Sequence, residues 1–208
     1  YVAGCDQYEM ETAYWPMRAL LRSVLGVAAD APGSDVLDAL TERVAELDPG
    51  LLPWVPLIAT VLDVECFPTP EVAALAEEFR KARLEDTVVR FLTSALREPS
   101  VIVIDDVHLM DDASADLLTS ICRRVPRRPW LVLLMRREAE QGFHPGDDAH
   151  VVQLRPGPLD SEASALLARR HLEDTTLTPE DVASLTRRAG GNPLFLRGLV
   201  LAARTGAP

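Results

Sequence analysis

Two adjacent carboxylates follow an apolar run near the middle of the chain. The run at 101–104 contains only valine and isoleucine, and Asp105 and Asp106 come directly after it. A divalent metal that binds phosphates needs a hard anionic oxygen, and a second carboxylate can orient an attacking water. Asp105 and Asp106 are therefore candidates for these two tasks. The competing interpretation is that the pair only begins a loop or caps the next helix.

The elements around this pair predict a parallel sheet. The run at 101–104 is typical of a strand buried on both faces, residues 112–124 are predicted to be helical, and 130–135 is a second apolar strand. Strand, helix and strand together imply a parallel unit with a right-handed crossover. Ligands of such sheets bind beyond the carboxyl ends of the strands, which is where the two aspartates lie. A further strand is predicted at 151–154.

The remaining segments are predicted to be mostly helical. A strand ends near residue 3, and helices are expected at 16–25, 34–47, 51–62 and 71–96, followed by 160–171, 178–188 and 192–204 after a Pro-Gly-Pro break. We therefore predict an α/β domain at 1–156, with a helical part at about 16–97 and the aspartate-bearing strand at 101–106. A small all-helical subdomain is predicted at 157–208.

Composition excludes several classes of function. The chain has 208 residues and a formal charge of -11, so its field repels phosphate backbones and anionic lipid. Five arginine pairs lie scattered among acidic helices, which favours a salt-bridged surface over a nucleic-acid site. The three cysteines show no paired spacing. We expect a cytoplasmic protein with no direct nucleic-acid or membrane partner.

The segment 101–118 resembles the Walker B segment of the STAND group of AAA-like P-loop ATPases. Such modules occur in large bacterial transcriptional regulators of the LuxR type and beside class III adenylate cyclases. The resemblance implies part of a P-loop NTPase sheet flanked by helices, in which Asp105 supports Mg2+ and Asp106 polarises the hydrolytic water. His108 either reads the terminal phosphate from the pocket rim or bonds to a neighbouring loop. Leu109 stands where tryptophan is usual in the family.

The resemblance extends over essentially the whole chain. Residues 5–21 are similar to the exit of the family's second strand and its following helix. An arginine after the strand at 130–135 would sense the terminal phosphate, with Arg137 the better fit and Arg136 the alternative. Residues 190–196 resemble the Gly-Asn-Pro motif of the family's helical lid. Asn192 can cap the last helix and Pro193 fits its first turn, and the resemblance places that proline against adenine.

The glycine-rich loop that grips phosphates is missing from the sequence. A P-loop requires G-x-x-x-x-G-K-[ST], yet Lys81 is the only lysine and the glycines of the motif do not stand before it. Because Tyr1 falls inside the expected second strand, we favour a piece cut from a longer protein over a degenerate parent. We expect ATP and Mg2+ to serve the intact parent, and this chain to bind ATP poorly and hydrolyse none detectably.

The leading hypothesis is an ATP-dependent regulatory switch that gates an output domain of a larger signalling or transcriptional regulator. Its expected partners are ATP or ADP, other domains of the parent and a possible second copy. The alternative is a catalytically silent scaffold for protein contacts. A phospho-receiver domain also places acids at strand ends, but the lysine it needs at a later strand end is absent. A serine hydrolase lacks its G-x-S-x-G elbow.

Overall fold

The computed structural model describes residues 1–146, 150–170 and 178–205, and the chain divides into two compact units, 1–151 and 152–208. The strands of the first unit are β1 (Val2–Gly4), β2 (Ser100–Asp105) and β3 (Trp130–Leu134). Its α-helices are α1 (Trp15–Leu25), α2 (Gly33–Leu47), α3 (Val55–Leu62), α4 (Pro70–Ala73), α5 (Glu77–Ala95) and α6 (Asp112–Cys122). Short 3-10 helices lie at Pro49–Trp54, Val107–Leu109 and Val125–Arg127.

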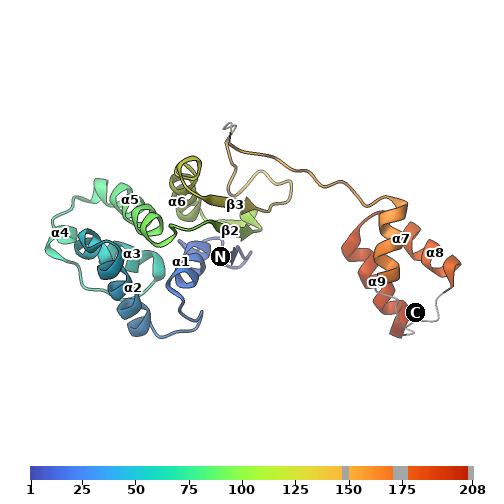
Figure 1. The fold of residues 1–208 in the computed structure, drawn as a ribbon, viewed down its shortest axis with the longest axis horizontal. Coiled ribbons are helices and arrows are strands. Elements are labelled where there is room, and N and C mark those ends of the chain that lie inside the picture. Colours follow the sequence, from blue (N-terminus) through green and yellow to red (C-terminus); the bar gives the residue numbers. More distant parts are fainter. Residues whose placement is uncertain (147–149, 171–177, 206–208) are drawn as a thin grey trace. The chain divides into compact units, whose positions relative to one another are not determined.

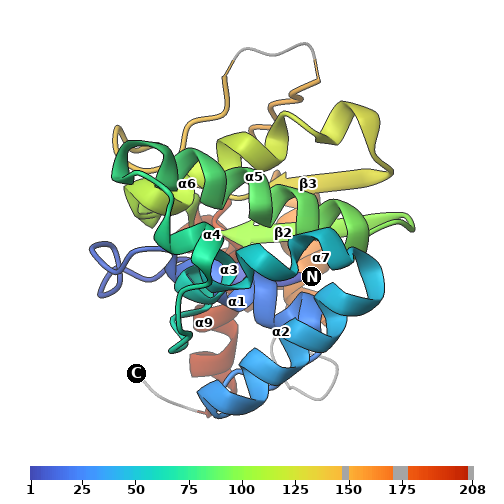
Figure 2. The same ribbon diagram turned by 90° about the vertical axis from the view of Figure 1, so that its left-hand side faces the viewer.

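The three described strands form one parallel sheet with β2 at its centre (Figure 1). Val103 of β2 is level with Val2 of β1 and with Leu133 of β3. The long segment between β1 and β2 is helical, as predicted, and α6 makes the crossover from β2 to β3. In Figure 2, α2, α3 and α5 stand nearest the viewer, in front of the sheet.

The two faces of the sheet differ in burial, which corrects the expectation that the run at 101–104 is buried on both. Ile102 and Ile104 are fully buried in the core shared with the helices, whereas Val101 keeps 46% of its surface exposed. On the same face as Val101, the exposed fractions are 69% at Val2, 53% at Leu131 and 44% at Leu133. Unbroken apolar composition marks a strand of a parallel sheet, but only packed partners decide whether both faces are covered.

The helix predicted at 71–96 is interrupted. α4 ends at Ala73 and α5 begins at Glu77, because Ala76 has an extended backbone (φ -62°, ψ 144°). Thr69 caps α4 by accepting a hydrogen bond from the Val72 amide. The acidic residues Glu77 and Glu78 lie in the first turn of α5, where negative charge is favourable. Phe79, in the first turn of α5, is 59% exposed.

Two other predicted elements are corrected. The helix expected at 51–62 is a 3-10 turn followed by α3, which begins at Val55 just after Pro53 interrupts α-helical bonding. Residues 151–154 form no strand: Val152 and Leu154 are 80% and 82% exposed and have no sheet partner. The strand was predicted because Val152 and Leu154 are apolar and stand at alternate positions, a pattern that an edge strand also shows.

The second unit is a small helical cluster built from α7 (Ser161–Arg170), α8 (Pro179–Ala189) and α9 (Pro193–Thr205). Its own core contains Ala168, Leu185, Ala189, Leu196 and Val200. Thr178 and its partner Asp181 form a reciprocal capping box at the start of α8. The end of the first predicted helix, at residue 171, lies outside the described residues. Across the described parts of the chain, no helix has both the length and the apolar character that a bilayer crossing requires.

Candidate functional site

An open hollow of about 330 Å³ lies at the carboxyl end of the sheet in the first unit. Asp106, His108 and Arg137 line it together with Leu109, and the segment 5–8 completes the lining. Asp106, His108 and Leu109 follow β2, whereas Arg137 follows β3. The segment 5–8 follows β1, so three strand ends contribute to one depression. Three residues selected from the sequence thus lie together beyond the carboxyl ends of the strands, where ligands of parallel sheets bind.

The two aspartates do not share this hollow. Asp105 is the last residue of β2 and falls, by strand alternation, on the sparsely covered face with Val101 and Val103. Asp106 adopts a left-handed backbone (φ 53°, ψ 39°), a conformation that aspartate tolerates better than most residues, and it lines the hollow. One oxygen of Asp105 accepts a hydrogen bond from the Asp106 amide at 2.8 Å. The chain thus turns sharply between the two carboxylates.

His108 is 7% exposed and lies between the turn after β2 and the loop after β3. Its Nδ1 atom accepts a hydrogen bond from the backbone amide of Arg137 at 3.4 Å. The same atom lies 3.8 Å from Oδ1 of Asp106, beyond hydrogen-bonding distance. Of the two roles left open for His108, the geometry supports contact with a neighbouring loop.

The loop after β3 separates the two arginine candidates. The guanidinium of Arg136 donates to the carbonyl oxygen of Phe143 at 2.7 Å and also to that of Ala139, so Arg136 closes its own loop. Arg137 is exposed and lines the hollow. The amide of Phe143 donates to the Val107 carbonyl at 2.9 Å, which attaches the loop to the turn after β2.

The segment 5–8 is the part of the site that the sequence interpretation assigned no role. Cys5, Asp6 and Gln7 are the first residues beyond β1, so the rule that selected Asp105 and Asp106 could also have found them. Partial burial, with the negative charges of Asp111, Asp106 and Asp105, raises the pKa of the Cys5 thiol to about 12. The thiol is therefore neutral at ordinary pH and lies in a negative environment.

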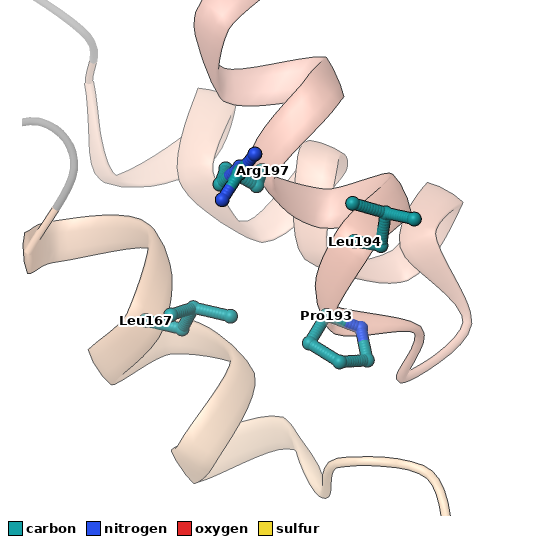
Figure 3. A pocket seen from close by; sticks show the side chains of 4 residues that line it. All are labelled: Leu167, Pro193, Leu194 and Arg197. Atoms are coloured by element: carbon teal, nitrogen blue, oxygen red, sulfur yellow. The ribbon is translucent and has the colours of Figure 1, made fainter. Parts of the chain in front are cut away.

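The Gly-Asn-Pro segment lies in the second unit and forms a helix start. Oδ1 of Asn192 accepts hydrogen bonds from the amides of Leu194 and Phe195 at 3.0 and 3.1 Å, as a capping residue does. Pro193 lines an apolar hollow of about 290 Å³ with Leu167, Leu194 and Arg197. Figure 3 shows Leu167 extending from α7 toward Pro193 at the start of α9. Asn192 is thus occupied as a cap, and Pro193 is exposed on a concave surface.

The carboxylates near the hollow indicate which kind of metal ion could bind there. Magnesium usually takes one or two carboxylates and fills its remaining positions with water and substrate phosphates. Asp105 and Asp106 supply hard oxygens of this kind at the strand end. Among the described residues, no group of three His, Cys, Asp or Glu side chains is placed to hold a metal. The described residues at this strand end therefore fit magnesium brought with a phosphate ligand.

Comparison with known proteins identifies the class. The family model described as AAA ATPase domain matches residues 2–134, which is more than half of the chain. The chain therefore belongs to the AAA ATPase domain family, whose members are nucleotide-hydrolysing domains that in general use ATP and Mg2+. This confirms the predicted AAA-like ATPase ancestry and agrees with the α/β sheet. The match includes Asp106 and His108 and ends before Arg137.

One curated relative is similar to part of the chain. An uncharacterized protein of Rhizobium meliloti (strain 1021) is 30% identical over 102 residues, which is 48% of this chain and 10% of the relative. The chain thus aligns with about a tenth of that protein's length. No solved structure matches the chain.

Proposed function

We propose that this chain is the Walker B and lid portion of an ATP-dependent switch of the STAND type, acting in the cytoplasm within a larger signalling or transcriptional regulator. The finer assignment rests on the segment 101–118 and on the Gly-Asn-Pro motif at 191–193. In this role, hydrolysis and exchange of nucleotide change the position of the helical lid and thereby gate other domains.

Each candidate residue has a distinct task in this proposal. Asp106 accepts a hydrogen bond from the attacking water and draws its proton away from the oxygen that attacks phosphorus. Asp105 supports the magnesium ion that neutralises phosphate charge. Arg137 donates charge-assisted hydrogen bonds to the terminal phosphate. Asn192 sets the start of α9, and Pro193 offers an apolar surface to the adenine base.

The observation that carries the proposal is that Asp106 and Arg137 line one hollow although they follow different strands. An anion in this hollow would have a guanidinium nearby, and a water near the same anion would have a carboxylate acceptor. Hydrolysis of a phosphoanhydride requires both kinds of group. The buried His108 supports their arrangement by joining the two segments that carry them.

This sequence does not contain the glycine-rich loop and lysine that bind the phosphates in a P-loop ATPase. Its only lysine, Lys81, lies on α5 and forms an ion pair with Asp116 on α6. Backbone amides of a glycine-rich loop normally make most contacts with the β- and γ-phosphates, and their loss removes much of the affinity. We therefore expect residues 1–208 alone to bind ATP weakly and to hydrolyse none detectably.

A binding titration tests the proposal. ATP with Mg2+ is titrated calorimetrically into residues 1–208 and into the same chain extended by the residues encoded before Tyr1. We expect weak or no binding by the first and micromolar binding by the second, with heat that disappears when Mg2+ is chelated. Failure of the extended protein to bind ATP or ADP at millimolar concentration would overturn the switch and favour the silent scaffold.

A further inference from the structure

The wall formed by residues 5–14 is attached at both ends to the segment that carries the aspartate pair. At one end, the amide of Cys5 donates to the carbonyl oxygen of Asp105 at 3.0 Å. At the other end, the amide of Tyr14 donates to Oδ1 of Asp111 at 3.1 Å. Between these bonds the wall shows local turns, including the amide of Tyr8 bonded to Oδ1 of Asp6.

Asp111 is suited to hold this attachment. Its side chain is 6% exposed, and the same Oδ1 atom also accepts from the Ser114 amide at 2.8 Å, which caps α6. Tyr14 precedes α1 in a left-handed conformation (φ 62°), and its amide donates to Asp111 outside that helix. One oxygen therefore joins the start of α1 to the start of α6. The raised pKa of Cys5, to which the Asp111 charge contributes, agrees with this proximity.

We propose that Asp111 is a positioning residue for hydrolysis: it holds the wall 5–14 against the turn that presents Asp106. The wall supplies residues 5–8 to the hollow, so its release would widen the space in which the attacking water is placed. Misplacement of reacting groups by about 1 Å costs on the order of a hundredfold in rate. The catalytic consequence rests on the proposed function, whereas the attachment itself does not.

Three variants separate positioning from simple helix capping. Asp111→Ala removes both hydrogen bonds, and Asp111→Asn keeps an oxygen that can accept both. Thr69→Ala removes the cap of α4, a helix in the segment between β1 and β2. It is the control for the loss of a helix cap at a different place in the first unit. If Asp111 acts only as a helix cap, Asp111→Ala and Thr69→Ala will have similar effects on amide exchange in the wall 5–14 and on kcat.

Amide hydrogen exchange on residues 1–208, measured well below the unfolding temperature, tests the attachment. We expect roughly tenfold faster exchange at Thr12 and Tyr14 in Asp111→Ala, near-normal rates in Asp111→Asn, and no change there in Thr69→Ala. Unchanged exchange in Asp111→Ala, or faster exchange spread evenly over the first unit, would overturn the proposal.

Turnover by the chain extended before Tyr1 tests the consequence. We expect Asp111→Ala to lower kcat roughly tenfold to a hundredfold with KM for ATP changed less, and Asp111→Asn to restore most of the rate. An equal loss of kcat in Thr69→Ala would overturn the positioning role. Absence of turnover in the unsubstituted extended protein would instead overturn the proposed function, and the exchange measurement alone would then decide the attachment.

Discussion

The backbone amide of Arg137 lies 3.4 Å from Nδ1 of His108, so a side chain from the turn after β2 holds the first residues of the loop after β3. This bond requires a ring that is unprotonated at Nδ1, since only that form can accept. Arg137 also lines the hollow, and the histidine thereby connects the position of Arg137 to that of Asp106.

Replacing His108 by alanine should loosen the loop after β3. The variant loses a buried side chain and its hydrogen bond, and we expect a loss of about 1–3 kcal/mol in the free energy of unfolding. Hydrogen exchange at the Arg137 amide should accelerate as well. Exposed His144 provides the control, because its replacement by alanine should leave that amide protected. Equal protection of Arg137 in both variants would show that the bond is not significant.

Gly142 lies where the loop after β3 packs against the backbone of the turn after β2. Its φ is +76°, and a Cβ atom at this position would lie 2.5 Å from backbone atoms of His108. We expect Gly142→Ala to destabilise the first unit by about 2–4 kcal/mol, since neither the backbone conformation nor the space accepts a methyl group. Gly146→Ala, which meets nothing within 4 Å, should be close to neutral in thermal unfolding. A similar melting temperature for the two variants would contradict this packing.

Gly191 gives the second unit a comparable test. A Cβ atom there would lie 2.7 Å from the carbonyl oxygen of Leu159, and φ is +79°. Gly191→Ala should therefore melt α7–α9 at lower temperature. Gly198→Ala should raise stability by up to about 1 kcal/mol, because Gly198 lies in α9 with open space around it. Thermal unfolding monitored by circular dichroism distinguishes these outcomes. Equal shifts of the melting temperature in the two variants would contradict the close approach of Gly191 to Leu159.

The Cys5 thiol predicts a dependence of stability on alkaline pH. Its folded pKa of about 12 exceeds the ordinary value of 9.0, so the folded state keeps a proton that the unfolded state releases. The stabilisation is complete below pH 9 and is lost as pH rises from 9 toward 12. The unfolding free energy of the unsubstituted protein minus that of Cys5→Ser should therefore fall across this range. A constant difference would show that the thiol titrates normally.

The sequence predicted the parts of the fold that local patterns control. Apolar runs located β2 and β3, and Asn192 with Pro193 located the start of α9, because backbone chemistry alone favours that boundary. The parallel arrangement of β2 and β3 was predicted from the helix that connects them. By contrast, the break at Ala76 could not be predicted, since alanine favours helix and only the packing of α4 and α5 selects the extended conformation.

Part of the lining of the candidate site could be predicted for a similar reason. Asp106, His108 and Arg137 were found because each follows a recognisable strand or motif, and the structure brings them to one hollow. Strand alternation alone could have warned that Asp105 faces away from Ile104. The role of Asp111 depends on a contact with Tyr14, 97 residues away, which no local pattern reveals.

Replacing Asp106 tests whether this strand end hydrolyses nucleotide in the complete domain. ATP turnover is measured in the chain extended before Tyr1, comparing Asp106→Asn with Asp112→Asn, a nearby exposed acid on α6. We predict at least roughly a hundredfold loss of kcat in Asp106→Asn with ATP binding retained, and little change in Asp112→Asn. Undiminished turnover in Asp106→Asn would contradict the account.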